Sequence, residues 1–481
     1  MTQDTILRQF LESAPVGIDA KKIGAEWLAL SPEYNVNQWR LPLPLWAQRP
    51  YEDTGVRAWE ILQDDLKHGP VNKPVCIYLH IPFCTSKCGF CDSYSFRLGA
   101  HANEHIDAYV DHLCDELKLW SERGNLNHRP ISTVHLGGGT PAFIGEAALT
   151  RLVECCREWF AVSDRTEWAL ETTASSLTPG MTSALHALGF RRLHIGVQTL
   201  EAASRREIGR CSHPWKVLER IAAIRSLGWI VSVDLICGLP FQTLPGFIAG
   251  IEDLIAAGSN GYSLYELLIY PQNQKWAEQH LLTGRDHLPN YLMFQAGAQQ
   301  LAKHGFKKNL FNHWADALDE NNYFTFPVRT EDCLAVGTIA DGVFGDYHYR
   351  HPRYSDYLRL AQNAFPGLEG GLRMTPLEAK MQPFITAIES GAIAADLRLN
   401  LESLSSGEND LVSRWLAGGL VRESGGGMLE LTDSGSWFAG NLIADLRLLF
   451  PEAQALGLRE RPHARIEKRL ERREIKPGSQ K

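Results

Sequence analysis

The chain has 481 residues, of which 44% are hydrophobic, and a formal net charge of −8 at pH 7. This length is enough for one large domain of barrel size and one or two smaller units. The mild acidity gives no support to nucleic acid as a partner. Because no apolar run reaches membrane length and the start does not read as a signal peptide, we expect a cytoplasmic protein without a membrane span.

Strand and helix patterns alternate through the middle of the chain. Predicted strands cover residues 75–81, 132–136, 167–172, 192–197, 231–237 and 262–269. Helical patterns follow at 104–120, 146–160, 180–188, 214–227 and 245–257. Strands that alternate with helices in this way predict an α/β fold, a partial (β/α)6 TIM-like barrel. In such a barrel the catalytic groups lie at the C-terminal ends of the strands.

The remaining segments predict smaller units around this barrel. A short hairpin after two or three helices resembles a winged-helix-like C-terminal unit, for which we expect a structural role because it lacks a basic recognition face. The expected domains are an N-terminal arm (1–73), the barrel (74–272), a cap or substrate region (273–372), the winged-helix-like unit (373–450) and a charged tail (451–481). The segment 39–46 is either a packing arm or a distinguishing feature of this chain.

Three cysteines lie close together directly after the first predicted strand, at Cys84, Cys88 and Cys91. A zinc site would usually show paired C-x2-C knuckles with a distant second half. Three thiolates instead leave one iron of a four-iron cluster without a protein ligand, whereas an electron-transfer ferredoxin normally supplies a fourth cysteine. The spacing therefore favours a [4Fe–4S] cluster with an open iron, which suits S-adenosylmethionine (SAM) as the added ligand.

Glycines and polar residues follow several later strands. The run Gly137–Pro141 removes Cβ atoms from a turn, so that backbone groups can approach a ligand or simply turn tightly. Glu171 and Gln198 end their strands, and Arg210, twelve residues after Gln198, can pair a carboxylate. Asp234 lies inside an apolar run, where a carboxylate is costly to bury unless it is paired, so we expect it to face the barrel mouth.

Four ordered motifs resemble one group of radical SAM proteins. They are Tyr78-x-His-Ile-Pro-Phe before the cysteines, Gly-Gly-Gly-Thr-Pro at 137–141, Gly-Val-Gln at 196–198, and Asp-Leu-Ile-Cys-Gly-Leu-Pro-Phe-Gln-Thr at 234–243. The group contains oxygen-independent coproporphyrinogen III oxidases, the related heme chaperones, anaerobic heme-degrading enzymes and class C radical methyltransferases. The likeness covers residues 74–272 and returns near 432–445.

The resemblance implies a role for each matching residue. It makes Cys84, Cys88 and Cys91 the cluster ligands, Tyr78 the catalytic tyrosine that contacts the cleaved SAM, and Gly138 and Glu171 further contacts of that first SAM. The residues that would surround a second SAM are Gly139, Thr140, Gln198, Arg210 and Asp234. The expected cofactors are thus a [4Fe–4S] cluster and one or two SAM molecules. Expected partners are a small-molecule substrate and a reductant such as flavodoxin or ferredoxin.

Two functions remain open at this point. The coproporphyrinogen oxidases carry an extra cysteine two residues after the third ligand, where this chain has Ser93, which counts against the decarboxylase itself. We expect a radical SAM enzyme that acts on a tetrapyrrole or another unsaturated substrate, with the second SAM as a methyl or methylene donor. The alternative is a heme chaperone-like protein that binds heme and delivers it without turnover. The segments 321–324 and 335–340 match the chaperones loosely.

Overall fold

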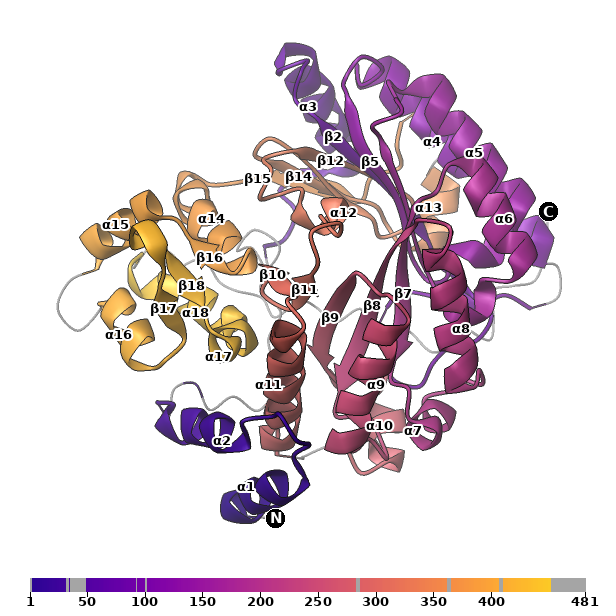
Figure 1. The fold of residues 1–481 in the computed structure, drawn as a ribbon. Helices are drawn as coiled ribbons and strands as arrows, with labels where there is room; N and C mark the ends of the chain where they lie inside the picture. Colours follow the sequence, from indigo (N-terminus) through magenta and orange to yellow (C-terminus); the bar gives the residue numbers. More distant parts are fainter. Residues whose placement is uncertain are drawn as a thin grey trace.

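The computed structural model describes residues 2–31, 34, 49–91, 93–99, 102–282, 286–360, 365–405 and 410–450. The expected charged tail and the segment 39–46 lie outside these residues. A large α/β body stands beside a smaller C-terminal unit, and the first helices lie against the body near that unit (Figure 1). Within the described ranges no helix is both long and apolar enough to cross a membrane.

The body is built on six consecutive parallel strands. They are β2 (Val75–Ile81), β5 (Ile131–Gly138), β6 (Glu167–Thr172), β7 (Arg192–Gln198), β8 (Ile230–Cys237) and β9 (Gly261–Glu266). The helices that follow them cover the outer face of the sheet (Figure 1): α4 (Ala102–Arg123), α5 (Glu146–Trp159), α6 (Pro179–Leu188), α8 (Pro214–Arg225) and α9 (Leu244–Ala256). These six strands and five helices confirm the predicted elements, with ends that differ by at most three residues.

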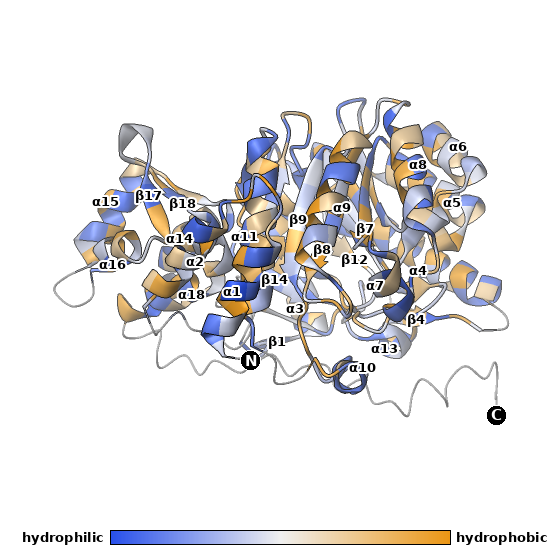
Figure 2. Ribbon diagram, turned by 60° about the horizontal axis from the view of Figure 1, so that its bottom comes forward, coloured by the Kyte–Doolittle hydropathy of each residue, from blue (hydrophilic) through white to orange (hydrophobic). Residues whose placement is uncertain are grey.

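Local sequence explains why these elements begin where they do. Thr178 and Thr243 stand at the N-caps of α6 and α9, where their hydroxyls accept from the backbone N–H groups of Met181 and Gly246. Both helices also have proline in their first turn, where a missing N–H costs nothing. Figure 2 shows hydrophobic and hydrophilic residues mixed around α9 and α11 (Leu288–Lys303), and α11 is buried over most of its length because several elements pack on it.

Short strands extend this sheet at both edges. Strand β12 (Asp332–Val336) pairs in parallel with β2, and the next strands are antiparallel: β13 (Asp341–Phe344), β14 (Tyr347–Arg350), β15 (Gly370–Arg373) and β1 (Asp53–Thr54). Beyond β9 lie β11 (His313–Ala315) and β10 (Lys307–Leu310). The region expected as a cap therefore supplies six of the strands. The strand order of the described residues does not close into a ring, which agrees with the predicted partial barrel.

The C-terminal unit has the element order of a winged helix. Its helices and strands are α14 (Pro376–Glu389), β16 (Ala392–Ile393), α15 (Ala395–Leu404), α16 (Leu411–Ala417), β17 (Val421–Glu423), β18 (Leu429–Leu431), α17 (Asp433–Trp437) and α18 (Ala439–Asp445). The three strands pair in the order β16–β18–β17. Tyr291 of α11 shares a hydrogen bond of 2.7 Å with Ser434 of α17, which ties this unit to the body. The domain boundaries themselves remain a proposal.

The N-terminal helices and several short elements complete the fold. Helices α1 (Gln3–Ser13) and α2 (Ala20–Ala29) pack on α11, and the Trp27 ring lies 4.8 Å from that of Tyr291. Further elements are α3 (Gly55–His68) and the shorter β3 (Phe83–Cys84), β4 (Phe96–Arg97), α7 (Ala202–Glu207), α10 (Gln274–Gln279), α12 (Asn322–Thr325) and α13 (Tyr354–Leu360). In Figure 1, α7 and α10 lie at the lower end of the body, and α12 lies toward its upper end.

The segment that contains α12 fills the inside of the barrel at the N-terminal ends of its strands. Its Asp319 is fully buried and accepts hydrogen bonds from Arg192, from Ser232 (2.6 Å) and from His313 (3.0 Å). A buried carboxylate of this kind needs such partners, since an unpaired one would be very costly. The same segment places Tyr323 and Phe324 under the middle of the sheet and forms a floor below the C-terminal ends.

Candidate active site

A cavity of about 460 Å³ lies where the cysteine loop meets the C-terminal ends of β5 to β8. Every residue of the predicted site except Tyr78 lines it, namely Cys84, Cys88, Cys91, Gly138, Gly139, Thr140, Glu171, Gln198, Arg210 and Asp234. These residues come from six separate places in the chain. The fold therefore brings together what the sequence motifs only suggested.

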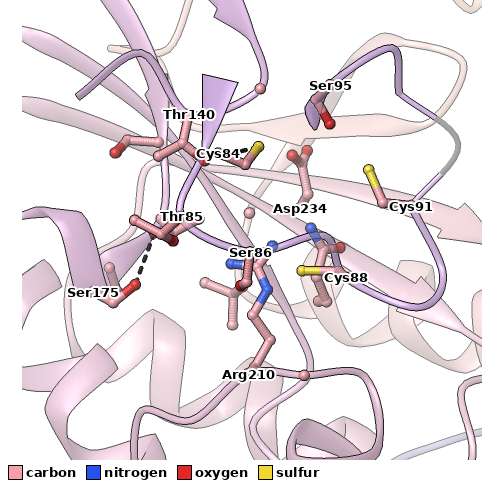
Figure 3. Close-up of a pocket in the computed structure, with 18 of the residues that line it drawn as sticks. Cys84, Thr85, Ser86, Cys88, Cys91, Ser95, Thr140, Ser175, Arg210 and Asp234 are labelled. Atoms are coloured by element: carbon pink, nitrogen blue, oxygen red, sulfur yellow. Dashed lines mark hydrogen bonds between the residues drawn. The ribbon is translucent and has the colours of Figure 1, made fainter. Parts of the chain in front are cut away.

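The three cysteines are spread along one wall of this cavity (Figure 3). The hydroxyl of Thr140 donates to Cys84 Sγ at 3.6 Å, and the Cys91 N–H donates to the Cys88 carbonyl at 3.2 Å. Among the described residues no three His, Cys, Asp or Glu side chains are grouped as ligands of one metal ion. Three thiols that line one cavity fit the ligand set that the spacing predicted for a four-iron cluster.

The cysteine loop is held from outside by the segment after β9. The amide of Asn273 donates to the carbonyls of Phe90 and Leu268, both at 2.8 Å. A Cβ atom at Gly89 would lie only 2.2 Å from the indole nitrogen of Trp276, so this glycine permits close packing of the loop on α10. These contacts fix the position of the loop between its second and third cysteines.

The glycine turn after β5 is joined to the strand that leads into the cysteines. The Gly139 N–H donates to the Ile81 carbonyl at 2.7 Å, and a Cβ atom there would lie 2.6 Å from the Phe83 carbonyl oxygen. Gly138 has a φ of +106°, a conformation that favours glycine, and its N–H donates to Glu171 Oε2 at 3.0 Å. The turn therefore fixes both the cysteine loop and the carboxylate of Glu171.

Glu171 is also held by a histidine that the sequence analysis did not single out. His135 Nε2 donates to Glu171 Oε1 at 3.0 Å. Burial tends to raise the pKa of Glu171, but the hydrogen bond and the nearby His135 outweigh it and the pKa lies below its ordinary value. Glu171 is thus an ionised carboxylate with 28% of its side chain exposed toward the cavity.

Tyr78 is not among the residues that line this cavity. Its hydroxyl donates to His80 Nδ1 at 3.0 Å, while His80 Nε2 donates to the Tyr94 carbonyl at 3.3 Å. Burial lowers the pKa of His80 to about 4, so this ring is neutral and its Nδ1 can accept. A Cβ atom at Gly137 would lie 2.7 Å from the Tyr78 ring. The same Cβ atom would lie 2.7 Å from Glu171 Oε1, so Tyr78 is next to a residue that lines the cavity, and its contact with SAM stays a prediction.

The second half of the cavity contains polar groups without partners. Gln198 has a φ of +70° at a bulge in β7, and its buried Oε1 has no hydrogen-bond partner. The buried Nε of Arg210 also has none. His194 Nε2 donates to Asp234 Oδ1 at 2.7 Å, and 23% of the Asp234 side chain is exposed. Because unpaired buried polar atoms are costly, the unpaired atoms suit a polar ligand here.

Arg205 supports this half of the cavity and also escaped the sequence analysis. Its guanidinium donates to the carbonyls of Val197 (3.1 Å), Thr199 (2.8 Å) and Ser212 (3.0 Å), which lie on both sides of the Gln198 bulge.

A sequence signal does exist for His135 and His194, the two histidines that the sequence analysis did not single out. Both stand two residues before a glycine, in His135-Leu-Gly and in His194-Ile-Gly.

Comparison with known proteins gives one family match, several relatives and a similar fold. Residues 78–254 match the radical SAM superfamily. The chain is 26% identical over 401 residues to anaerobilin synthase of Escherichia coli O157:H7, which covers 80% of this chain and 87% of the relative. It is 24% identical over 273 residues to the heme chaperone HemW of Buchnera aphidicola, which covers 56% of this chain and 70% of that one.

The fold has a solved counterpart in coproporphyrinogen III oxidase (HemN) from Escherichia coli, described as a radical SAM enzyme. The TM-score is 0.71 with 19% identity, over 85% of this chain and 96% of the other. The parallel partial barrel of this chain therefore has the same fold as that enzyme. Residues 78–254 of this chain thus match a superfamily whose members bind a [4Fe–4S] cluster and SAM.

Proposed function

We propose that this protein is a radical SAM enzyme that acts on a tetrapyrrole or another unsaturated small molecule. The observation that carries the proposal is the single cavity that joins three thiols to two histidine-held carboxylates, Glu171 and Asp234. An electron carrier would need only the cluster. The additional charged and polar groups on the same cavity are what a protein needs to hold an amino acid and a ribose beside that cluster.

Under this proposal Cys84, Cys88 and Cys91 hold the [4Fe–4S] cluster, and Gly138 with Glu171 holds the first SAM. When bound and reduced, the cluster supplies the electron that cleaves SAM to methionine and a 5′-deoxyadenosyl radical. Glu171 contributes an ionised carboxylate that can accept from the ammonium group of SAM. The buried floor under the cavity excludes water from one side. Tyr78, whose hydroxyl donates to His80, would contact the cleaved SAM, as its place in the motif implies.

A second SAM molecule would occupy the other half of the cavity. The unpartnered Gln198 Oε1 and Arg210 Nε and the exposed edge of Asp234 support this, because one SAM at the cluster would leave them unpaired. Gly139 and Thr140 line the same cavity. This second molecule would serve as methyl or methylene donor. We further propose that the protein works in the cytoplasm with a reductant such as flavodoxin or ferredoxin.

A heme chaperone-like role is the second candidate. It is supported by relatives that carry the name heme chaperone, among them the one from Buchnera aphidicola. In that role the protein would bind heme tightly and release it to an acceptor, and the cluster would have a supporting part.

One anaerobic experiment separates the two roles. Cluster-loaded protein is incubated with SAM, dithionite and either heme or coproporphyrinogen III. 5′-Deoxyadenosine and S-adenosylhomocysteine are quantified together with altered tetrapyrrole. The enzyme role predicts more than one turnover with at least one of these substrates, and loss of 5′-deoxyadenosine in the Cys84→Ala/Cys88→Ala/Cys91→Ala variant. Stoichiometric heme binding without any altered tetrapyrrole would instead support the chaperone role.

A further inference from the structure

Two similar units lie side by side beneath the cavity, on alternate strands of the barrel. Strand β5 carries His135 and β7 carries His194, and each is followed two residues later by a glycine. Because side chains alternate along a strand, the histidine and the glycine of each unit face the same side of the sheet. Each histidine donates from Nε2 to a carboxylate on the next strand, Glu171 for the first and Asp234 for the second.

The glycines keep the space above each histidine open. A Cβ atom at Gly137 would lie 2.7 Å from Glu171 Oε1, and one at Gly196 would lie 2.7 Å from Gln198 Nε2 and 3.6 Å from Arg210 Nη2. Real Cβ atoms do not come within 2.7 Å of another atom, so Glu171 and Gln198 each occupy room that only a glycine leaves, whereas Arg210 lies at an ordinary contact distance. Each unit therefore consists of a carboxylate that a histidine holds, Glu171 or Asp234, beside a glycine that leaves the backbone accessible.

Adjacent aromatic residues of the floor support the two imidazoles from below. The Tyr323 ring stacks on His135 with 4.2 Å between centroids and 19° between planes, and the Phe324 ring lies 5.4 Å from His194. The Nδ1 atoms of both histidines are buried without a partner. Within the described residues, each imidazole therefore has its carboxylate as its hydrogen-bond partner, and its ring has little room to turn away.

The two carboxylates differ in how many contacts hold them. Glu171 is held at both oxygens, by His135 and by the Gly138 N–H at 3.0 Å. Among the described residues, the side chain of Asp234 accepts a hydrogen bond from His194 alone. Its other oxygen stays available to a ligand, because the side chain lines the cavity (Figure 3). Loss of His194 should therefore disturb Asp234 more than loss of His135 disturbs Glu171.

We propose that His135 and His194 are positioning residues for two separate SAM sites, and that His194 sets the affinity of the second. This inference rests on the proposed function, in which Glu171 serves the first SAM and Asp234 the second. A hydrogen bond to a charged group stabilises by roughly 1.5–3 kcal/mol. Removal of the His194 donor should thus weaken the second site about tenfold to a hundredfold.

The test is equilibrium dialysis of radiolabelled SAM against anaerobic, cluster-loaded protein. Unaltered protein should bind two molecules. His194→Leu should lose affinity at the second site only, with cluster absorption and first-site affinity retained. His194→Gln keeps an N–H donor near the position of Nε2 and should recover most of the lost affinity, a rescue that a merely structural role would not give. His135→Leu is the matched control and should spare the second site.

Each further outcome has a clear meaning. A second site of unchanged affinity in His194→Leu, with two molecules bound, would overturn this inference and leave the proposed function intact. Equal weakening of both sites by His194→Leu, without rescue by glutamine, would overturn it as well and point to general loosening of the barrel. A single SAM bound to unaltered, cluster-loaded protein would instead overturn the two-SAM part of the proposed function. Thermal unfolding of each variant identifies those that lose their fold.

Discussion

Asp319 anchors the floor of the barrel, and its charge can be removed without a change of shape. In Asp319→Asn, the buried guanidinium of Arg192 loses its carboxylate, and Ser232 and His313 lose an ionised acceptor. The side chains of Asp319 and Arg192 are 0% and 3% exposed. The removal of one partner of such a buried pair costs about 3–5 kcal/mol. The carboxylate of Glu167 lies 3.9 Å from Arg192 and still partly compensates its charge. We therefore expect Asp319→Asn to lower the free energy of unfolding by about 3 kcal/mol.

The assay is urea unfolding at pH 7, followed by circular dichroism. Glu320→Gln, on the exposed neighbouring residue, removes the same charge and should change the free energy of unfolding by no more than about 0.5 kcal/mol. The double variant Asp319→Asn/Arg192→Met should lose less free energy of unfolding than Asp319→Asn alone, because it leaves no unpaired buried charge. If the free energy of unfolding of Asp319→Asn stays within about 1 kcal/mol of that of the unaltered protein, the reasoning on this buried pair is wrong.

The same carboxylate gives a dependence on pH. Burial tends to raise the pKa of Asp319, but Arg192 and His313 outweigh it and hold the pKa well below its ordinary value. The folded protein therefore keeps Asp319 ionised when the unfolded chain already binds a proton. The stability from this group is complete above the ordinary pKa of about 4 and is lost as the pH falls below it. The difference in the free energy of unfolding between Asp319→Asn and the unaltered protein should therefore become smaller only in that acidic range.

Two further predictions concern the cysteine loop and the strand before it. Gly89→Ala should displace the loop, because its Cβ atom would lie 2.2 Å from Trp276, and should lower iron bound per chain, whereas Gly99→Ala, with nothing within 4 Å, should leave it unchanged. Burial lowers the pKa of His80 to about 4, so between pH 7 and pH 5 only the unfolded chain takes up a proton at this residue. The free energy of unfolding should therefore fall by about 2 kcal/mol over this range. In His80→Gln this part of the pH dependence should vanish from urea unfolding, and an unchanged slope would contradict the assignment of a neutral ring.

Much of this protein can be read from local sequence. Apolar runs such as that of β8 must be buried on both faces, so their length and their spacing by helices already specify a parallel sheet. The cysteine spacing is likewise a local property, because three thiols on one short loop can face a common ligand in almost any fold. The carboxylates and glycines at strand ends could also be predicted, since parallel strands place their C-terminal ends at one edge.

Contacts between distant strands could not be read in this way. His135 contacts Glu171 over a separation of 36 positions in the sequence, and Arg192 contacts Asp319 over 127 positions. The residues around each of them in the sequence do not indicate which partner it will have. Alternation along a strand tells which side a residue faces, but the order of strands decides what it touches there. The contact of Tyr78 with Tyr323 of the floor, with 4.9 Å between ring centroids, could not be predicted for the same reason. The strands of the expected cap are only three to five residues long, too short for a periodic pattern, and only pairing with the main sheet defines them.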